Sequence, residues 1–306
     1  MNFHSILAIT NLSPQGNRAV LRAAMLAARR RALLKIMYAP SHLGAFISTG
    51  VEQDVKRLAA EIYRRFDILV KNVADTSGHL EAVAEEARWA DLLVVGEHWN
   101  PSFKAFFCGQ PIERLQRNAP CPILLARLEV VDRYRRILVA IDSAPNPNRL
   151  LKLARSLDRN AEVEPFHALK TKLSGLVDED LSEQALEACQ HESTGNAQEH
   201  LFRATDSPTA RPSRVATMTG RSDGARQAAT QQLHSNADLI VVGKPRRSGF
   251  SDFVFGNVAH RVLRLSSRDV LLVPLDLRID PAAETMTSSM DRRDQLATQH
   301  AVGSRG

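Results

Sequence analysis

The sequence has few cysteines, few aromatic residues and no long apolar run. Its three cysteines, Cys108, Cys121 and Cys189, form no CxxC pair and have no zinc-ligand spacing, which favours a reduced compartment. No apolar stretch approaches the roughly 20 residues that a membrane-spanning helix needs. The first residues also lack the basic and long apolar segments of a secretory signal. We therefore expect a soluble, cytoplasmic protein with no membrane partner.

A block of charge of one sign is missing as well. The chain has 40 basic and 34 acidic residues, and only 5% of its residues are aromatic. It therefore offers neither the basic stripe that follows a phosphate backbone nor a set of stacking platforms for bases. Residues 29–31, all arginine, form the densest basic cluster at the predicted end of a helix, where the dipole favours positive charge. We interpret this cluster as a solvated helix end and expect no nucleic-acid partner, with DNA binding as the lesser alternative.

The sequence does contain an internal repeat. Residues 91–96 match residues 238–243 at an offset of 238 − 91 = 147, and residues 6–11 match residues 137–142 at an offset of 137 − 6 = 131. Two copies of one fold are therefore predicted, the second longer by 147 − 131 = 16 residues, which we place between Lys170 and Arg211. We predict domains at 1–130 and 131–277, joined through the polar stretch 128–135, and a disordered tail at 278–306.

Apolar runs alternate with helical spacings in both copies, which predicts parallel sheets with helices on both faces. In the first copy we expect a helix after strand 6–11, with Asn17 as its N-cap, and a third strand at 68–70. In the second copy the third strand is expected at 215–218 and the last two strands at 238–243 and 269–274. Three helices of that copy are expected to face inward through Leu150, Ala154 and Leu157, through Ala225, Ala229 and Leu233, and through Val258, Val262 and Leu265.

The turn after residues 238–243 is the most informative loop. It contains Arg246, Arg247 and Gly249 and leads to Gly256 and Asn257 at the start of the next helix. A glycine-rich, basic loop between a strand and a helix N-terminus is a candidate anion site. Histidines are scattered without ligand spacing, so no metal site is expected.

These features resemble the universal stress protein family, in its tandem form with two domains in one chain. The resemblance rests on residues 238–243, on their spacing to Gly256, on the segments 117–125 and 267–274, and on Asp142 after the first strand of the second copy. It implies two tandem doubly wound parallel sheets of five strands, of order 3-2-1-4-5, in the adenine nucleotide alpha hydrolase-like α/β fold. It also implies an internal pseudo-dimer through 122–127 and 270–275, which would pair both fifth-strand edges, with a homodimer of chains left open.

Nucleotide-binding members of this family carry Gly, two residues, Gly, nine residues, Gly, and then Ser or Thr, and the N–H groups of this loop bind phosphates. The second copy keeps the outer glycines and the Asp, so the resemblance implies a nucleotide site made by Asp142, Gly243, Arg246, Arg247, Gly249, Gly256 and Asn257. In the first copy Trp99 replaces the second Gly, and we expect a degenerate site at the positions Asn11, Gly96, Gly109 and Gln110.

We therefore expect a stress-response protein with a regulatory or protective role, which binds ATP or another adenine nucleotide in its second domain. No metal is expected apart from nucleotide-associated Mg. Its other partners are expected to be proteins whose identity the sequence does not specify. One alternative is an interaction scaffold without a nucleotide, and a slow ATPase ranks last because no base or carboxylate pair is evident near the loops.

Overall fold

The computed structural model describes residues 3–39, 50–73, 80–96, 121–129, 133–141, 147–170, 216–220, 224–244 and 258–275. Residues Met1–Leu275 form one compact unit. The predicted tail at 278–306 and nearly all of the region assigned to the insertion lie outside the described residues.

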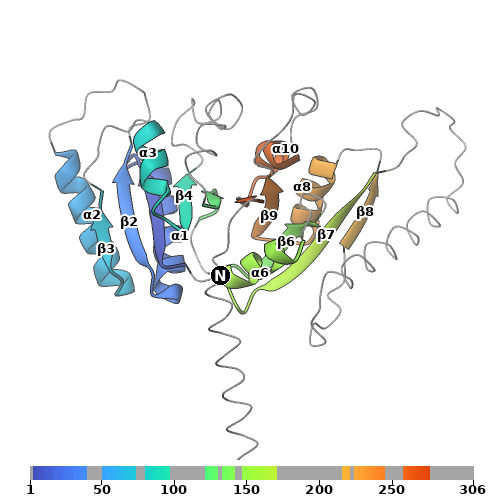
Figure 1. The fold of residues 1–306 in the computed structure, drawn as a ribbon, viewed down its shortest axis with the longest axis horizontal. Coiled ribbons are helices and arrows are strands. Elements are labelled where there is room, and N and C mark those ends of the chain that lie inside the picture. Colours follow the sequence, from blue (N-terminus) through green and yellow to red (C-terminus); the bar gives the residue numbers. More distant parts are fainter. Residues whose placement is uncertain are drawn as a thin grey trace, which may run out of the picture. The chain divides into compact units, whose positions relative to one another are not determined.

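The first half of the chain folds into a five-stranded parallel sheet with helices between the strands (Figure 1). Its strands pair in the order β3-β2-β1-β4-β5, so β1 lies in the middle with Ile6 paired to Leu34 on one side and to Leu92 on the other. The elements are β1 (Ser5–Thr10), α1 (Pro14–Arg30), β2 (Leu33–Tyr38), α2 (Val51–Phe66), β3 (Val70–Asn72), α3 (Leu80–Ala87), β4 (Leu92–Gly96) and β5 (Ile123–Ala126).

The second half repeats this arrangement, with the strand order β8-β7-β6-β9-β10. Ile137 of the central strand pairs with Leu239, which is the Ile6–Leu92 pair displaced by 131 and 147 residues. The predicted strand order 3-2-1-4-5 is confirmed in both halves. The elements are β6 (Arg136–Ala140), α6 (Pro147–Leu157), β7 (Glu162–Lys170), β8 (Ala216–Gly220), α8 (Gly224–His234), β9 (Leu239–Lys244), α10 (Val258–Leu265) and β10 (Asp269–Pro274).

The two fifth strands join the halves into one sheet of ten strands. β5 and β10 pair in antiparallel fashion, with Leu124 opposite Leu271. Since 271 − 124 = 147, each of these leucines is the repeat counterpart of the other, and the pairing follows a local pseudo-twofold axis. The predicted internal pairing of 122–127 with 270–275 is confirmed.

The inner strands are buried because helices cover them. Every residue of β4 and β5 is buried, as expected for a parallel sheet with both faces covered, where an apolar run needs no alternation. Val83, Ala84 and Ala87 pack from α3, and Leu150, Ala154 and Leu157 face inward on α6 as predicted.

Helix α1 begins earlier than predicted. Its N-cap is Ser13, whose hydroxyl accepts a hydrogen bond from the Gly16 N–H at 3.1 Å, and Pro14 is the first helical residue. The prediction of Asn17 as N-cap was therefore wrong. A serine followed by proline at the first helical position satisfies one free N–H and supplies a suitable φ. Arg31 ends the helix in the left-handed conformation.

Three other boundaries or faces were also wrong. β3 begins at Val70 instead of residue 68, and Leu69 is 73% exposed. In α8 the predicted inward Leu233 is exposed, because Gln232 turns inward to donate to the Asp269 carbonyl and accept from the Ser266 hydroxyl. The inward face of α10 consists of Ala259, Val262 and Leu263, whereas Val258 and Leu265 are partly exposed.

The segment that joins the halves contains a buried anchor, whereas the sequence suggested only a polar connection. The Tyr134 side chain is buried and its hydroxyl donates to Asp269 Oδ2 at 2.7 Å. The other carboxylate oxygen accepts from the backbone N–H groups of Arg127 at 2.7 Å and Leu128 at 2.9 Å. Burial, together with the neighbouring Asp269 carboxylate, raises the pKa of Tyr134 well above its usual value, so this hydroxyl stays protonated and donating.

The arginine cluster at the end of α1 is exposed at Arg29 and Arg31 but also makes contacts with the second half. Arg29 forms an ion pair with Asp158, which is 5% exposed, and Arg30 donates to the Ser156 carbonyl oxygen at the end of α6. Both contacts connect the first half to the second. The prediction of a solvated cluster is thus confirmed for the exposure of Arg29 and Arg31 but missed these contacts, because sequence spacing alone does not show which helix end lies opposite.

Loss of the Tyr134 hydroxyl should destabilise the protein. In the variant Tyr134→Phe the fully buried Asp269 carboxylate loses a donor, and we expect a fall of about 1–3 kcal/mol in the free energy of unfolding. Urea denaturation, monitored by circular dichroism, measures this free energy. Tyr63→Phe is the matched control, since Tyr63 is 54% exposed, and its change should stay within about 0.5 kcal/mol. Equal losses of stability in the two variants would contradict the role of the Tyr134 hydroxyl as a buried donor to Asp269.

Cys121 should be inert in the folded protein. Its side chain is 2% exposed, and burial raises the pKa of the thiol to about 12, so almost no thiolate is present at pH 8. In a Cys108→Ser/Cys189→Ser background we expect Cys121 to react with a disulfide reagent only in denaturant, at the rate of global unfolding. Fast labelling of the native protein at pH 8 would contradict its burial.

Candidate functional site

The candidate site lies where the carboxyl ends of the first and fourth strands of each half lie side by side. β1 has β2 on one side and β4 on the other, and β6 has β7 and β9 in the same way (Figure 1). At such a point the strand order reverses, and open α/β sheets bind ligands beside the carboxyl ends of these strands. The predicted residues can therefore be compared in two equivalent places.

In the first half the turn between β1 and α1 binds its own polar side chains. Asn11 Oδ1 accepts from the Ser13 N–H at 3.1 Å and from the Ser13 hydroxyl at 2.6 Å. Thr10 Oγ1 accepts from the Leu12 N–H at 2.9 Å and donates to Asn17 Oδ1 at 2.9 Å. Leu12 takes a left-handed φ of 62° to close this turn. The amide oxygen at the position of the family's Asp thus stabilises the N-cap of α1.

The glycines beside this turn are required by close packing. A Cβ on Gly16 would lie 2.4 Å from Asn11 Oδ1 and 3.0 Å from the Asn11 backbone nitrogen. A Cβ on Gly96, at the end of β4, would lie 3.0 Å from the Gln15 carbonyl oxygen. The structure therefore brings Asn11 and Gly96 together around the first turn of α1, where both are explained by packing without a ligand. Gly109 and Gln110 lie outside the described residues.

In the second half the structure describes one of the seven predicted residues. Gly243 is buried near the end of β9, one residue beyond Val242, which pairs with Ala140 at the end of β6. Gly243 also lies opposite Val273 of β10. Asp142, Arg246, Arg247, Gly249, Gly256 and Asn257 lie outside the described residues. Their role in binding stays a prediction.

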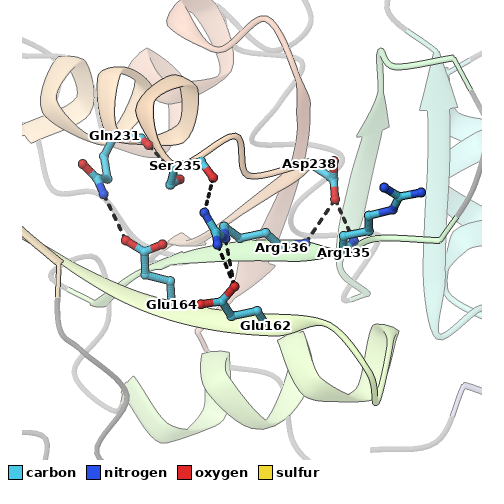
Figure 2. A network of polar contacts seen from close by, with 7 residues as sticks. All are labelled: Arg135, Arg136, Glu162, Glu164, Gln231, Ser235 and Asp238. Carbon is cyan, nitrogen blue, oxygen red and sulfur yellow. Dashed lines mark hydrogen bonds and ion pairs between the residues drawn. The ribbon is translucent and has the colours of Figure 1, made fainter.

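The amino edge of the sheet holds a polar network that the sequence reasoning missed as a unit. Asp238 accepts from the backbone N–H groups of Arg135 at 2.7 Å and Arg136 at 3.1 Å (Figure 2). Asp91 makes the same pair of bonds to His4 and Ser5, at 2.7 and 3.0 Å. The repeat of Asp91 as Asp238 at the offset of 147 was the signal that could have revealed this shared role, in which the carboxylate binds the start of the central strand.

The rest of this network is paired internally. The Arg136 side chain donates to Glu162 and to the Ser235 carbonyl at the end of α8, while Gln231 of α8 donates to Glu164 at 3.0 Å (Figure 2). Each of these polar side chains has a partner within the group, and the bonds connect α8 to β6 and β7. We therefore interpret it as a structural element at the edge opposite the candidate site.

The described residues limit the chemistry of the site. Among them there is no group of three or more His, Cys, Asp or Glu side chains that could hold a metal ion. In the same part of the chain, no helix has the length and apolar character to cross a membrane.

Comparison with known proteins identifies related sequences and folds. The model of the Universal stress protein family matches residues 2–127 and again residues 133–274. Among curated proteins, no sequence matches this chain.

Several solved structures have the same fold. A universal stress protein from Archaeoglobus fulgidus DSM 4304 is 16% identical with a TM-score of 0.57, over 88% of this chain and 96% of that chain. A functionally unknown protein from Pseudomonas aeruginosa PAO1 is 20% identical with a TM-score of 0.60, over 90% and 94%. A universal stress protein in complex with cAMP is 21% identical with a TM-score of 0.31, over 46% and 98%.

The packing of Asn11 on Gly16 predicts a non-additive pair of substitutions. Alanine is a better helix former than glycine, yet Gly16→Ala should cost about 1–3 kcal/mol because its Cβ overlaps Asn11. Asn11→Ala removes the closest contact and leaves the one with Thr10 Oγ1 at 2.9 Å, so the double variant should lose less stability than the sum of the single losses. Thermal and urea unfolding of the four proteins measure this coupling. A stabilising effect of Gly16→Ala would contradict the observed contact.

Proposed function

The chain belongs to the universal stress protein family, with one domain in each half, and from this membership we propose a stress-response protein that acts by binding. Its second half would hold ATP or another adenine nucleotide, and its first half would serve the fold and its partners. Regulation or protection by such a protein requires no turnover.

The observation that carries this proposal is the place of Gly243. It follows directly on the paired ends of β6 and β9, at the point where the strand order of the second half reverses. The chain then supplies Gly249, Gly256 and Asn257, and Asp142 follows the neighbouring strand. Glycines, which have no Cβ to block a close approach, and an amide side chain at these positions suit phosphate oxygens, and Arg246 and Arg247 add positive charge.

The class of ligand follows from the family. One universal stress protein was solved in complex with cAMP, and one from Archaeoglobus fulgidus with dAMP. Adenine nucleotides are thus ligands of some of these proteins. For this chain ATP is our first choice because Arg246 and Arg247 are suited to more than one phosphate.

A scaffold without nucleotide is the second candidate, and the first half favours it. There Asn11 binds Ser13 and α1 packs tightly against Gly96, so these positions already have a structural role. If the second half were closed in the same way, the protein would act only through its surfaces. Slow ATP hydrolysis ranks last, because the sequence offers no evident base or metal-binding carboxylate pair near the loops.

Calorimetric titration of ATP into the full-length protein tests the proposal. We expect saturable heat with the unmodified protein and none with Gly256→Trp, because the indole would fill the space that the phosphates need. Gly109→Trp is the matched control, since Gly109 stands at the equivalent position of the first half, and it should bind as the unmodified protein does.

Absence of heat with the unmodified protein would favour the scaffold. Equal loss in both variants, with circular dichroism spectra unchanged, would move the site out of the second half. Release of ADP that Asp142→Ala abolishes would instead support an enzyme.

A further inference from the structure

Several polar side-chain contacts across the junction between the halves have the same direction. Arginines of the first half donate hydrogen bonds or form ion pairs, and carboxylates and carbonyl oxygens of the second half are their partners. Arg22 Nε lies 3.3 Å from Asp269 Oδ2, and Arg29 pairs with Asp158. Two more arginines donate to carbonyl oxygens at helix ends of the second half. Arg30 donates to Ser156, and Arg127 donates to both Ser266 and Leu263, the latter at 2.7 Å.

Three of the charges in these contacts are deeply buried. The side chains of Arg22 and Asp269 are 4% and 0% exposed, and Asp158 is 5% exposed, whereas its partner Arg29 is 35% exposed. The Arg22 guanidinium also lies 4.4 Å from the centre of the Tyr134 ring. Removal of one partner from such a pair leaves a buried charge without compensation, which is strongly unfavourable. The contacts therefore select the surface that can occupy this junction.

The backbone hydrogen bonds of the junction do not distinguish a first half from a second half. Leu124 pairs with Leu271, Ile123 with Leu272 and Leu125 with Val270, so each strand of the pair stands where the other would stand after a half-turn. By hydrogen bonds alone, β5 could pair with another β5, and β10 with another β10.

The side chains break this symmetry. With the offsets of 131 and 147, Arg22 corresponds to Leu153 and Asp158 to Ala27, while Asp269 corresponds to Pro122 and Arg127 to Pro274. Two first halves at this junction would bury Arg22 of each without the Asp269 carboxylate. Two second halves would bury Asp269 and Asp158 of each without arginine.

We propose that the β5–β10 junction is a charge-coded surface that accepts only the unlike half. The partner of the first half is a second half, either in the same chain or in a second copy that exchanges halves. Association of like halves through these strands is excluded, because specificity here comes from charges that only the unlike half satisfies.

Charge reversal at Arg29 and Asp158 tests this in the full-length chain. Arg29→Asp and Asp158→Arg should each lower the urea midpoint, and the double variant should regain at least half of the loss. Asp158→Asn removes the negative charge but keeps an oxygen that accepts from the Asn160 N–H. The fall in its urea midpoint, which should be smaller than that of Asp158→Arg, therefore measures the effect of the charge alone. The matched control is reversal of the exposed pair of Arg57 and Asp54, 74% and 54% exposed, which should leave the midpoint unchanged.

Refolding the two single variants together tests recognition between chains. Exchange of halves restores opposite charges at both junctions, so native mass spectrometry should show the mixed dimer in clear excess over either like dimer. If a single variant does not fold alone, recovery of folded mixed dimer supports the proposal equally. A double variant no more stable than the single variants, or a statistical mixture of like and mixed dimers, would overturn it.

Discussion

One buried carboxylate holds the two halves of this protein together. Asp269 is fully buried at the start of β10 and is bound by groups from three parts of the chain: the backbone after β5, the Tyr134 hydroxyl and the Arg22 guanidinium. A buried charge is tolerable only when such partners surround it. The antiparallel pairing of β5 with β10, and with it the ten-stranded sheet, depends on this arrangement.

Duplication has kept the backbone alike and made the side chains different. Asp91 and Asp238 still bind the starts of their central strands in the same way, and the strand order is the same in both halves. At the junction the counterparts of Arg22 and Asp269 are Leu153 and Pro122. Within each copy, backbone hydrogen bonds fix the fold. At the junction, the side chains of each copy must instead complement the charges of the other copy.

The two edges of the sheet have different roles. At the amino edge, carboxylates accept hydrogen bonds from backbone N–H groups and from the side chains of Arg136 and Gln231. At the carboxyl edge of the first half, Asn11 accepts hydrogen bonds from Ser13 and so stabilises the N-cap of α1. Gly96 beside it is required by the close approach of the Gln15 carbonyl oxygen.

The sequence by itself determined the duplication and the alternation of strands and helices, because buried parallel strands are apolar runs whose spacing repeats. The strand order and the pairing of the fifth strands came from the resemblance to the family. The sequence also located the inward face of α6. Only the tertiary structure decided the roles of Tyr134, Asp269 and the arginines of α1, because a polar residue becomes an anchor through a partner more than a hundred residues away. It likewise turned Gln232 inward in place of Leu233, since the carbonyl of Asp269 required a donor.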